Sequence, residues 1–419
     1  MASKSLTSQY KPLAIASGFG SILGSGIIVG LSATITVWQI GLHLSNSQVG
    51  VISGALTFAI ALGSLLAGTF SKKVGLIKTY NWTNLFYAIG TMICVLAPNY
   101  LTLLAGVIIT GLASGLDLPI SMTMISHDAP DDSTASSLVA STQIFWQIGV
   151  FMSYVCAFIV SKMAGATGAR VVFTILTAFA FITWLWRITS KKFRTFHEEG
   201  DKRQAVKGNT EKSEDASLKS VLSGEKNRKY LAFFFCILIF YVCWNLLANT
   251  FGQFQTFTLV QAHATQSFAT GAGIVLNFIS LAATMSFAKA AGSKYRNVFF
   301  FIGILVQLAA MLYLAFSSHD LWPIVVAIGA YNIGNNLAGE ALYKVWTQES
   351  FPSEARASVQ GFINGFSRLC CGLFAFVTPA LVVQSVIRYT MLGFAGLIAV
   401  SFVAGVIMIN LQKKYKKEN

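Results

Sequence analysis

Residues 130–136 read P-D-D-S-T-A-S, and residues 352–358 read P-S-E-A-R-A-S. Each stretch follows a long apolar run, and both fit the pattern P-x-[D/E]-x-x-A-S. An acid precedes each stretch, because Asp117 lies 13 residues before the first proline and Glu340 lies 12 residues before the second. The recurrence of the motif and of the acid predicts that the two halves of the chain share one plan.

The composition is that of a membrane protein. Of the 419 residues, 54% are hydrophobic and only 11% are charged, against about a quarter charged in a typical soluble protein. Because this small number of charges cannot cover a water-exposed surface of this size, most of the outer surface is expected to face lipid. This excludes a soluble enzyme, a nucleic-acid-binding protein and a disordered chain, although the net charge is +14.

Twelve apolar runs are each long enough to cross a bilayer, which takes about 20 residues. They cover residues 12–40, 46–70, 79–97, 101–126, 136–160, 169–189, 230–258, 266–289, 297–316, 322–348, 358–383 and 389–411. The polar segment 190–229 separates six runs from six. We therefore expect an all-α membrane protein with two pseudo-symmetric six-helix bundles, 1–189 and 230–419, joined by a cytoplasmic linker.

The distribution of basic residues predicts the orientation. With a cytoplasmic N-terminus, 25 of the 30 Lys and Arg fall on the cytoplasmic side, including all twelve between 187 and 229, and three fall on the opposite side. Lys344 and Arg368 remain within the spans. Because cytoplasmic loops are enriched in Lys and Arg, we expect a multi-pass protein of the cytoplasmic membrane with both termini in the cytoplasm.

The six-plus-six repeat resembles the plan of the major facilitator superfamily, whose solute site lies at the membrane midplane between the halves. The loop at 68–78, G-T-F-S-K-K-V-G-L-I-K, is similar to the superfamily pattern G-x-x-x-D-[R/K]-x-G-x-x-[R/K]. Lys73, Gly75 and Lys78 match, whereas Lys72 replaces the acid. The resemblance implies a role for the matching residues in a cytoplasmic gate, and the lysines are equally explained as topology signals.

Two further stretches resemble the sugar porter family of that superfamily. Residues 346–356, W-T-Q-E-S-F-P-S-E-A-R, are similar to its signature S-E-x-F-P-x-x-x-R, so Glu349 and Arg356 are predicted gate residues. Residues 126–149 resemble the junction between the fourth and fifth spans together with the fifth span. His127 and Asp128, near the cytoplasmic end of the fourth span, are assigned to the loop or gate.

The departures from the family pattern concern charge. In sugar porters an acid on the first span often handles the coupling proton, and the first span here has none. The family's two sugar-stacking tryptophans are replaced by Lys344 and Arg368. The resemblance therefore implies a sugar-like solute, and the two cations favour an anionic one.

Four ionisable residues lie within the spans, where each costs at least about 2.5–3.5 kcal/mol in hydrocarbon. Glu340 and Lys344 are four residues apart and share one helix face. Protonation of Glu340 would free Lys344 to meet an anion, which is a route to proton–anion symport. Asp117 is the proton-coupling candidate of the first half. The alternative is that these charges only neutralise one another, Glu340 with Lys344, and Arg368 with Glu340 or Asp117.

Amide and aromatic side chains within the spans predict recognition of hydroxyl groups, because amides both donate and accept hydrogen bonds. The alternative is hydrogen bonding between helices. The predicted solute-binding residues are Gln143, Trp146, Gln147, Asn245, Asn249, Gln253, Asn336, Lys344 and Arg368. The family resemblance points most directly to Gln143, Asn245 and Asn249.

No nucleotide-binding loop, metalloprotease motif or nucleophile elbow occurs in the sequence, and the six cysteines lack zinc-site spacing. We therefore expect no enzyme, no ATP-driven pump, no metal and no cofactor. The sequence predicts a monomeric secondary transporter in the lipid bilayer that imports a sugar-like solute, with a sugar acid favoured over a neutral sugar, by alternating access and proton symport. The alternatives are a neutral sugar or polyol symporter or uniporter and, with less support, a proton-coupled drug or metabolite exporter.

Overall fold

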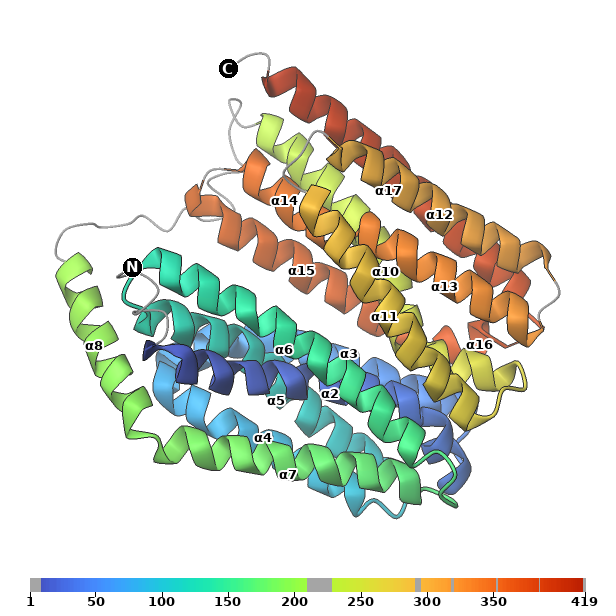
Figure 1. The fold of residues 1–419 in the computed structure, drawn as a ribbon, viewed down its shortest axis with the longest axis horizontal. Helices are drawn as coiled ribbons and strands as arrows, with labels where there is room; N and C mark the ends of the chain where they lie inside the picture. Colours follow the sequence, from blue (N-terminus) through green and yellow to red (C-terminus); the bar gives the residue numbers. More distant parts are fainter. Residues whose placement is uncertain are drawn as a thin grey trace. The chain divides into compact units, whose positions relative to one another are not determined.

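The computed structural model describes residues 9–208, 228–290, 295–317, 320–351, 353–383 and 385–416. Within these ranges the chain is almost entirely helical and contains no β-strand (Figure 1). It divides into two compact units, Met1–Ser213 and Glu214–Asn419. The expected all-helical membrane architecture is confirmed.

The first unit contains seven described helices. They are α2 (Lys11–Gly41), α3 (Asn46–Val74), α4 (Leu76–Val95), α5 (Tyr100–Asp128), α6 (Asp132–Ile159), α7 (Thr167–Thr189) and α8 (Lys191–Gly208). The first six correspond to the first six predicted spans. The seventh, α8, lies in the segment that we had expected to be a plain linker.

The second unit contains α10 (Arg228–Gln261), α11 (Gln266–Ala290), α12 (Arg296–Phe316), α13 (Leu321–Leu337), α14 (Glu340–Ser350), α15 (Ser353–Ala375), α16 (Thr378–Leu381) and α17 (Ile387–Lys416). Six predicted spans account for these eight helices, because two spans are interrupted. The tenth is divided into α13 and α14, and the eleventh into α15 and α16.

Polar side chains fix where several helices begin. Ser45 forms a capping box at the start of α3, in which its hydroxyl accepts from the Gln48 amide and the Gln48 side chain accepts from the Ser45 amide. Asn99 and Asp131 accept from backbone amides at the starts of α5 and α6. Such caps satisfy amides that have no partner within the helix, which explains why short polar segments suffice between long apolar ones.

The two units repeat one packing scheme. In the first unit α2 packs on α6 and α7, α3 packs on α5, and α4 packs on α5 and α7. In the second unit α10 packs on α15 and α17, α11 packs on α13, and α12 packs on α13 and α17. When the spans of each half are numbered from one to six, these are the same pairs. The pseudo-symmetry predicted from the sequence is therefore present in the packing.

Glycine pairs permit close helix crossings at equivalent positions of the two units. Gly90 of α4 faces Gly106 of α5, where a Cβ built at Gly106 would lie 2.7 Å from the Gly90 carbonyl oxygen. Gly303 of α12 faces Gly334 of α13, where a Cβ built at Gly334 would lie 2.5 Å from the Gly303 carbonyl oxygen. Small residues let membrane helices approach to backbone contact, and here they do so between the third and fourth spans of both halves.

The helix α8 is amphipathic and packs on the first unit. Phe193 and Phe196 are buried in a cluster with Tyr10 and Leu13, and the Tyr10 and Phe196 ring centroids are 4.4 Å apart. Short polar sequences with two phenylalanines carry a weak helix signal, so only the structure shows that the chain continues as a helix after α7.

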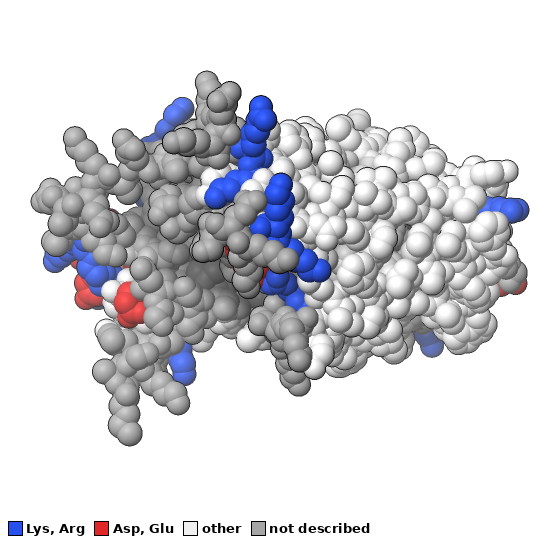
Figure 2. Space-filling view, turned by 90° about the horizontal axis from the view of Figure 1, so that it is seen from above, with Lys and Arg blue, Asp and Glu red and all other residues white. Residues whose placement is uncertain are grey.

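The outer surface is suited to lipid. Eight helices among the described residues are long and apolar enough to cross a bilayer. Many large apolar side chains remain exposed on them, including Leu65, Leu101, Phe278, Leu305 and Val403. On the face shown in Figure 2, a broad surface carries neither acids nor bases, and charged side chains gather toward one end of the view.

Replacing Gly334 with Ala should destabilise the protein, because the new methyl group would overlap the Gly303 carbonyl and Gln307. Overpacking of this kind costs about 1–3 kcal/mol, which thermal unfolding of the detergent-purified protein will measure. Gly361→Ala is the matched control, because nothing lies within 4 Å of a Cβ at that position. Equal unfolding temperatures for the two variants would show that the close crossing contributes no stability.

Candidate functional site

In the first unit, Asp117 and Arg187 form a buried ion pair. Arg187 Nη1 lies 2.5 Å from Asp117 Oδ1, and the two side chains are 0% and 5% exposed. The guanidinium also donates to the backbone carbonyls of Tyr80 and Ala16, at 3.0 and 2.9 Å. Four helices, α2, α4, α5 and α7, therefore meet at this one cation.

Neighbouring side chains complete this pair. The guanidinium lies 3.9 Å above the centre of the Tyr80 ring, and Ser121 donates to Asp117 Oδ2 at 3.3 Å. Gly20 leaves room for the carboxylate, since a Cβ there would collide with it. Because nearly every polar atom of the pair has a partner, both charges are tolerated at full burial.

The position of Arg187 corrects one part of the sequence analysis. We had counted it among the cytoplasmic bases, and that assignment is wrong because its side chain is fully buried within the helical bundle. The signal was present in the apolar run W-L-W-R-I-T at 184–189, where a lone cation needs an internal partner. Asp117 was correctly singled out as an intramembrane acid, but its partner was not foreseen.

The fifth span places Trp146 and Gln147 partly exposed on α6. Trp146 lies against α2, with its ring 3.2 Å from a Cβ built at Gly24. The side chain of Gln143 lies outside the described residues. The predicted role of these three residues in solute binding stays a prediction.

In the second unit, Glu340 and Lys344 pair along the first turn of α14. Lys344 Nζ lies 2.8 Å from Glu340 Oε1, and the side chains are 43% and 50% exposed, respectively. The i, i+4 spacing predicted this shared face. Unlike the ion pair of the first unit, this one remains open on one side.

The break between α13 and α14 sets the position of Glu340. The helix α13 ends at Leu337, and Gly339 adopts φ −147° and ψ −136° before Glu340 begins α14. Two side chains donate to backbone carbonyls beside the break, and the Gly334 carbonyl also accepts from the Ala338 amide. Gln307 Nε2 donates to the Gly334 carbonyl at 3.1 Å, and Trp244 Nε1 donates to the Asn335 carbonyl at 3.3 Å.

An acid at this position also benefits from the helix terminus, because the first turn of a helix carries partial positive charge. Interrupted helices that present an end to a polar site are a recurring device in transporters. The apolar pattern of the sequence predicted a single span at 322–348, because the interruption takes only two residues, Ala338 and Gly339.

Arg368 of α15 belongs to the same group of charges. Its Nε donates to Asn364 Oδ1 at 3.2 Å, and it interacts electrostatically with Glu340. Behind the charges, Tyr241 stacks on Tyr343 with centroids 4.0 Å apart and on Trp244 at 5.4 Å. These three aromatic residues are buried, and the predicted set of site residues did not include them.

The predicted amides of the second unit already hold partners within it. Asn245 Nδ2 donates to Ser367 Oγ at 2.8 Å, next to Arg368. Gln253 Nε2 donates to Asn249 Oδ1 at 2.9 Å, and Asn336 Oδ1 accepts from Thr284 at 2.9 Å. Asn245, Asn249 and Asn336 stay partly exposed, whereas Gln253 is buried. Hydrogen bonds to other side chains thus use one donor or acceptor atom of each amide.

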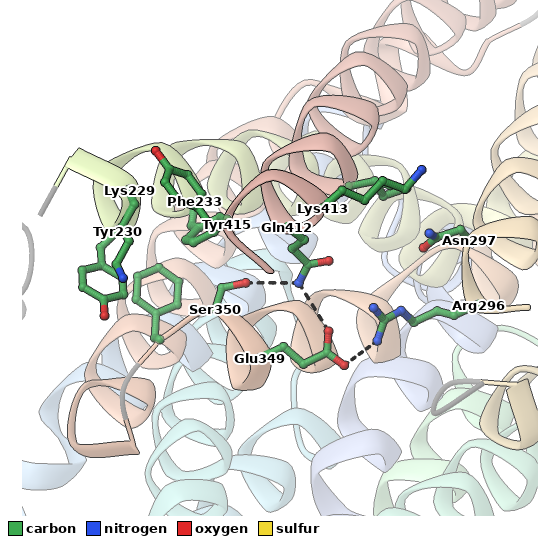
Figure 3. Close-up of a pocket in the computed structure, with 12 residues that line it drawn as sticks. Lys229, Tyr230, Phe233, Arg296, Asn297, Glu349, Ser350, Gln412, Lys413 and Tyr415 are labelled. Atoms are coloured by element: carbon green, nitrogen blue, oxygen red, sulfur yellow. Dashed lines mark hydrogen bonds and ion pairs between the residues drawn. The ribbon is translucent and has the colours of Figure 1, made fainter. Parts of the chain in front are cut away.

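Glu349 lies at the opposite end of α14 from Glu340. It forms an ion pair with Arg296 at 2.6 Å and accepts from Gln412 at 3.3 Å (Figure 3). These residues line a cavity of about 850 Å³ at the ends of α10, α12, α14 and α17, together with Lys229, Tyr230 and Lys413. Glu349, which the gate signature singled out, therefore joins α14 to α12 and α17.

The other predicted gate residues are resolved in part. Lys73 and Lys78 are exposed. Gly75 joins α3 to α4 with φ +100°, a conformation that glycine adopts far more readily than other residues, so its place in the loop pattern has a backbone reason. The side chain of Arg356 lies outside the described residues.

The sequence matches the family model described as Major Facilitator Superfamily over residues 14–375. The chain belongs to this superfamily, which is a class of membrane transporters. The expected resemblance is confirmed, and the protein is a multi-pass membrane protein that transports a solute and is not an enzyme.

The chain is also similar to individual transporters of known name and to solved structures. The chain is 26% identical to the minor myo-inositol transporter IolF of Bacillus subtilis over 413 residues, covering 96% of this chain and 91% of the relative. Among solved structures, a D-xylose-proton symporter superposes with a TM-score of 0.75 at 16% identity, covering 96% of both chains. A bacterial homologue of the human lysosomal transporter Spinster superposes with a TM-score of 0.73 at 15% identity, covering 96% of this chain and 98% of the other. The solved structures share the fold.

Replacing Arg187 with Gln should destabilise the protein strongly, because Asp117 would then be a buried carboxylate without a cation. Removal of one partner of a buried pair costs about 3–5 kcal/mol, measurable as a lower unfolding temperature in detergent. Arg194→Gln, on the exposed surface of α8, should unfold as the wild type does.

The double variant Asp117→Asn, Arg187→Gln should recover part of that loss, since neither residue then leaves a lone buried charge. If the single Arg187→Gln variant unfolds like Arg194→Gln, the pair does not hold the four helices together.

Proposed function

We propose that this protein imports a sugar-like solute, with a sugar acid preferred, by proton symport through the cytoplasmic membrane. The proposal includes an orientation with both termini in the cytoplasm and a monomer as the transporting unit. The observation that carries the proposal is the group of charges at Glu340, Lys344 and Arg368. Two cations and one carboxylate leave a net charge of +1, which suits a solute with one carboxylate.

The exposure of these side chains supports the proposal. Glu340 and Lys344 each keep close to half of their surface accessible, although they lie in a predicted membrane span. Charged side chains rarely face lipid and instead face the protein interior or a water-filled cavity. Water that reaches Lys344 also gives a dissolved anion a path to it.

The proposed coupling uses the ion pair directly. With Glu340 ionised, its carboxylate occupies Lys344. A proton on Glu340 cancels that charge, so the Lys344 ammonium is free to bind the solute carboxylate while Arg368 offers a planar, bidentate donor. Release of the proton restores the ion pair and displaces the solute. Proton and anion therefore move together.

We assign the coupling proton to Glu340 ahead of Asp117. The Asp117 carboxylate is fixed by Arg187 and nearly inaccessible, so a proton has neither a path to it nor a vacant position there. Its proposed role is to hold helices together, and a coupling role for Asp117 is the alternative. The two acids, which lie at equivalent places in the repeat, would then have different roles: Glu340 carries the proton and Asp117 stabilises the helix packing.

Hydroxyl recognition falls to the amides near the charges. Asn245 lies beside Ser367 and Arg368 through its hydrogen bond, and Asn249 lies one turn further along α10. We propose these two amides as hydrogen-bond partners of the solute, with Asn336, Gln253 and, in the first unit, Gln143, Trp146 and Gln147 completing the set. Lys73, Gly75, Lys78, Glu349 and Arg356 are the proposed gate residues.

A second candidate function is transport of a neutral polyol. It is favoured by the similarity to a protein named as a myo-inositol transporter, which covers nearly the whole chain. In that case Lys344 only neutralises Glu340, Arg368 is held by its hydrogen bond to Asn364, and the amides alone select the solute. The charge preference of uptake separates the two candidates.

Glu340→Gln should abolish uptake driven by a proton gradient, because the amide cannot bind and release a proton, while exchange of labelled for unlabelled solute continues. A loss of about tenfold or more is expected in gradient-driven uptake into proteoliposomes. Glu198→Gln, on the exposed face of α8, should behave as the wild type. Unchanged gradient-driven uptake in the Glu340 variant would refute the proposed coupling residue.

Lys344→Gln and Arg368→Gln should each weaken uptake of glucuronate much more than uptake of glucose or myo-inositol, because each removes one cation from the group. Loss of a charge-assisted hydrogen bond of about 1.5–3 kcal/mol corresponds to an affinity loss of about 10–150-fold. Competition uptake assays with the three solutes will measure it.

Arg368→Lys is the matched control for that series, since it keeps the charge and removes the fork of donors. It should bind glucuronate better than Arg368→Gln does. Wild-type uptake of myo-inositol without any uptake of glucuronate would overturn the anion preference in favour of the neutral polyol.

A further inference from the structure

Two histidines and two aspartates converge where α8 packs on the end of α5. His127 Nδ1 and His197 Nδ1 lie 2.8 and 3.0 Å from the same atom, Asp128 Oδ1. On the other edge of the rings, Asp201 Oδ1 lies 3.2 Å from His127 Nε2 and 4.0 Å from His197 Nε2. The two imidazole centroids are 4.8 Å apart. The two rings are thus held between two carboxylates.

Asp128 is the unusual member of this group. Its side chain is fully buried, and its Oδ2 atom has no hydrogen-bond partner among the described residues. Arg203 approaches it but donates to the Asp128 backbone carbonyl, at 2.6 Å, and not to the carboxylate. A buried carboxylate needs a positive partner, and the groups that face it here are imidazoles.

The geometry points to a binding site for one divalent transition-metal ion such as Zn²⁺, with His127 Nδ1, His197 Nδ1 and the Asp128 carboxylate as ligands. Each of these residues offers a ligand atom within 4.8 Å of the others. Tetrahedral zinc with bonds of about 2.0–2.1 Å needs ligand atoms about 3.3 Å apart. The two Nδ1–Oδ1 distances, 2.8 and 3.0 Å, are a few tenths of an ångström shorter than this, so small side-chain shifts would admit the ion, with water as its fourth ligand.

Asp201 would orient the two histidine ligands and not bind the metal itself. Metal-binding histidines usually donate their second ring N–H to a carboxylate, which fixes the tautomer and the ring orientation. With the metal at the Nδ1 atoms, both Nε2–H groups face Asp201. Imidazole nitrogen with carboxylate oxygen suits zinc and similar ions better than magnesium or calcium, which prefer oxygen ligands alone.

The local structure holds these ligands in place. His197 and Asp201 share one face of α8 at i, i+4 spacing. Gly200 lets that face meet α5 directly, because a Cβ there would lie 2.7 Å from His127 Nδ1. Phe193 and Phe196 anchor α8 one turn earlier in the buried cluster with Tyr10 and Leu13. A bound ion would therefore join α8 to α5 without rearrangement of either helix.

The test is zinc binding to the full-length protein, purified in detergent with an affinity tag free of histidine and stripped with a chelator that is then removed. Titration calorimetry with Zn²⁺ should show one ion per chain, and Co²⁺ should give the visible absorption of a nitrogen- and oxygen-ligated site. Hydrogen exchange in α8 should slow when Zn²⁺ is added.

Variants identify the site. His197→Ala should lower zinc affinity at least about tenfold, and Asp201→Asn, which leaves the exposed residue nearly isosteric, should lower it about 10–100-fold. His43→Asn is the matched control and should bind zinc as the wild type does. His43 has φ 53°, a left-handed conformation that Asn tolerates well.

The outcomes separate clearly. Absence of zinc binding by the folded wild type overturns the proposal. So does binding that persists unchanged in both His197→Ala and Asp201→Asn, or that His43→Asn loses equally. Should His197→Ala fail to fold, Asp201→Asn with the Co²⁺ spectrum still decides, because only a residue beside the metal changes both affinity and absorption.

Discussion

A charged side chain inside a bilayer must be neutralised by a partner or reached by water, and the two halves of this protein meet that constraint in different ways. In the first unit, Asp117 and Arg187 neutralise each other at full burial. In the second unit, Glu340 and Lys344 are paired yet remain close to half exposed. The closed pair joins four helices, whereas the open pair leaves part of both side chains accessible. Duplication of one helical plan has thus yielded a rigid site and an accessible one.

The shared packing scheme makes this difference informative. The same helix pairs touch in both units, and glycine pairs permit close crossings at equivalent places. What differs is local. The fourth span of the first unit is the continuous helix α5 through Asp117, although it contains Pro119, whereas the equivalent span of the second unit stops at Leu337 and restarts at Glu340. The interruption frees the acid from the interior of a helix and places it at a helix start.

The sequence alone was sufficient to predict the helical architecture and the shared face of Glu340 and Lys344 in the second unit. Apolar runs and the repeated motif gave the spans and the symmetry, because membrane insertion imposes length and composition strictly. The spacing of Glu340 and Lys344 gave their shared face. By contrast, the partner of Asp117 lies 70 residues away at Arg187, and His127 and His197 meet across a similar gap. Contacts between distant segments leave no periodic trace, so Arg187 was misassigned and the packing of α8 on α5 was not foreseen.

The short helix α14 has one further consequence. Its first residue, Glu340, belongs to the open pair, and Glu349 near its last turn binds Arg296 and Gln412. A helix of 11 residues spans about 16 Å and moves as a stiff rod, with Ala338 and Gly339 as its only joint to α13. A tilt of about 10° at that joint shifts the far end by nearly 3 Å, by the same rise per residue. If a change of charge at Glu340 tilts the segment, the helix would act as a lever and displace the ion pair at its other end.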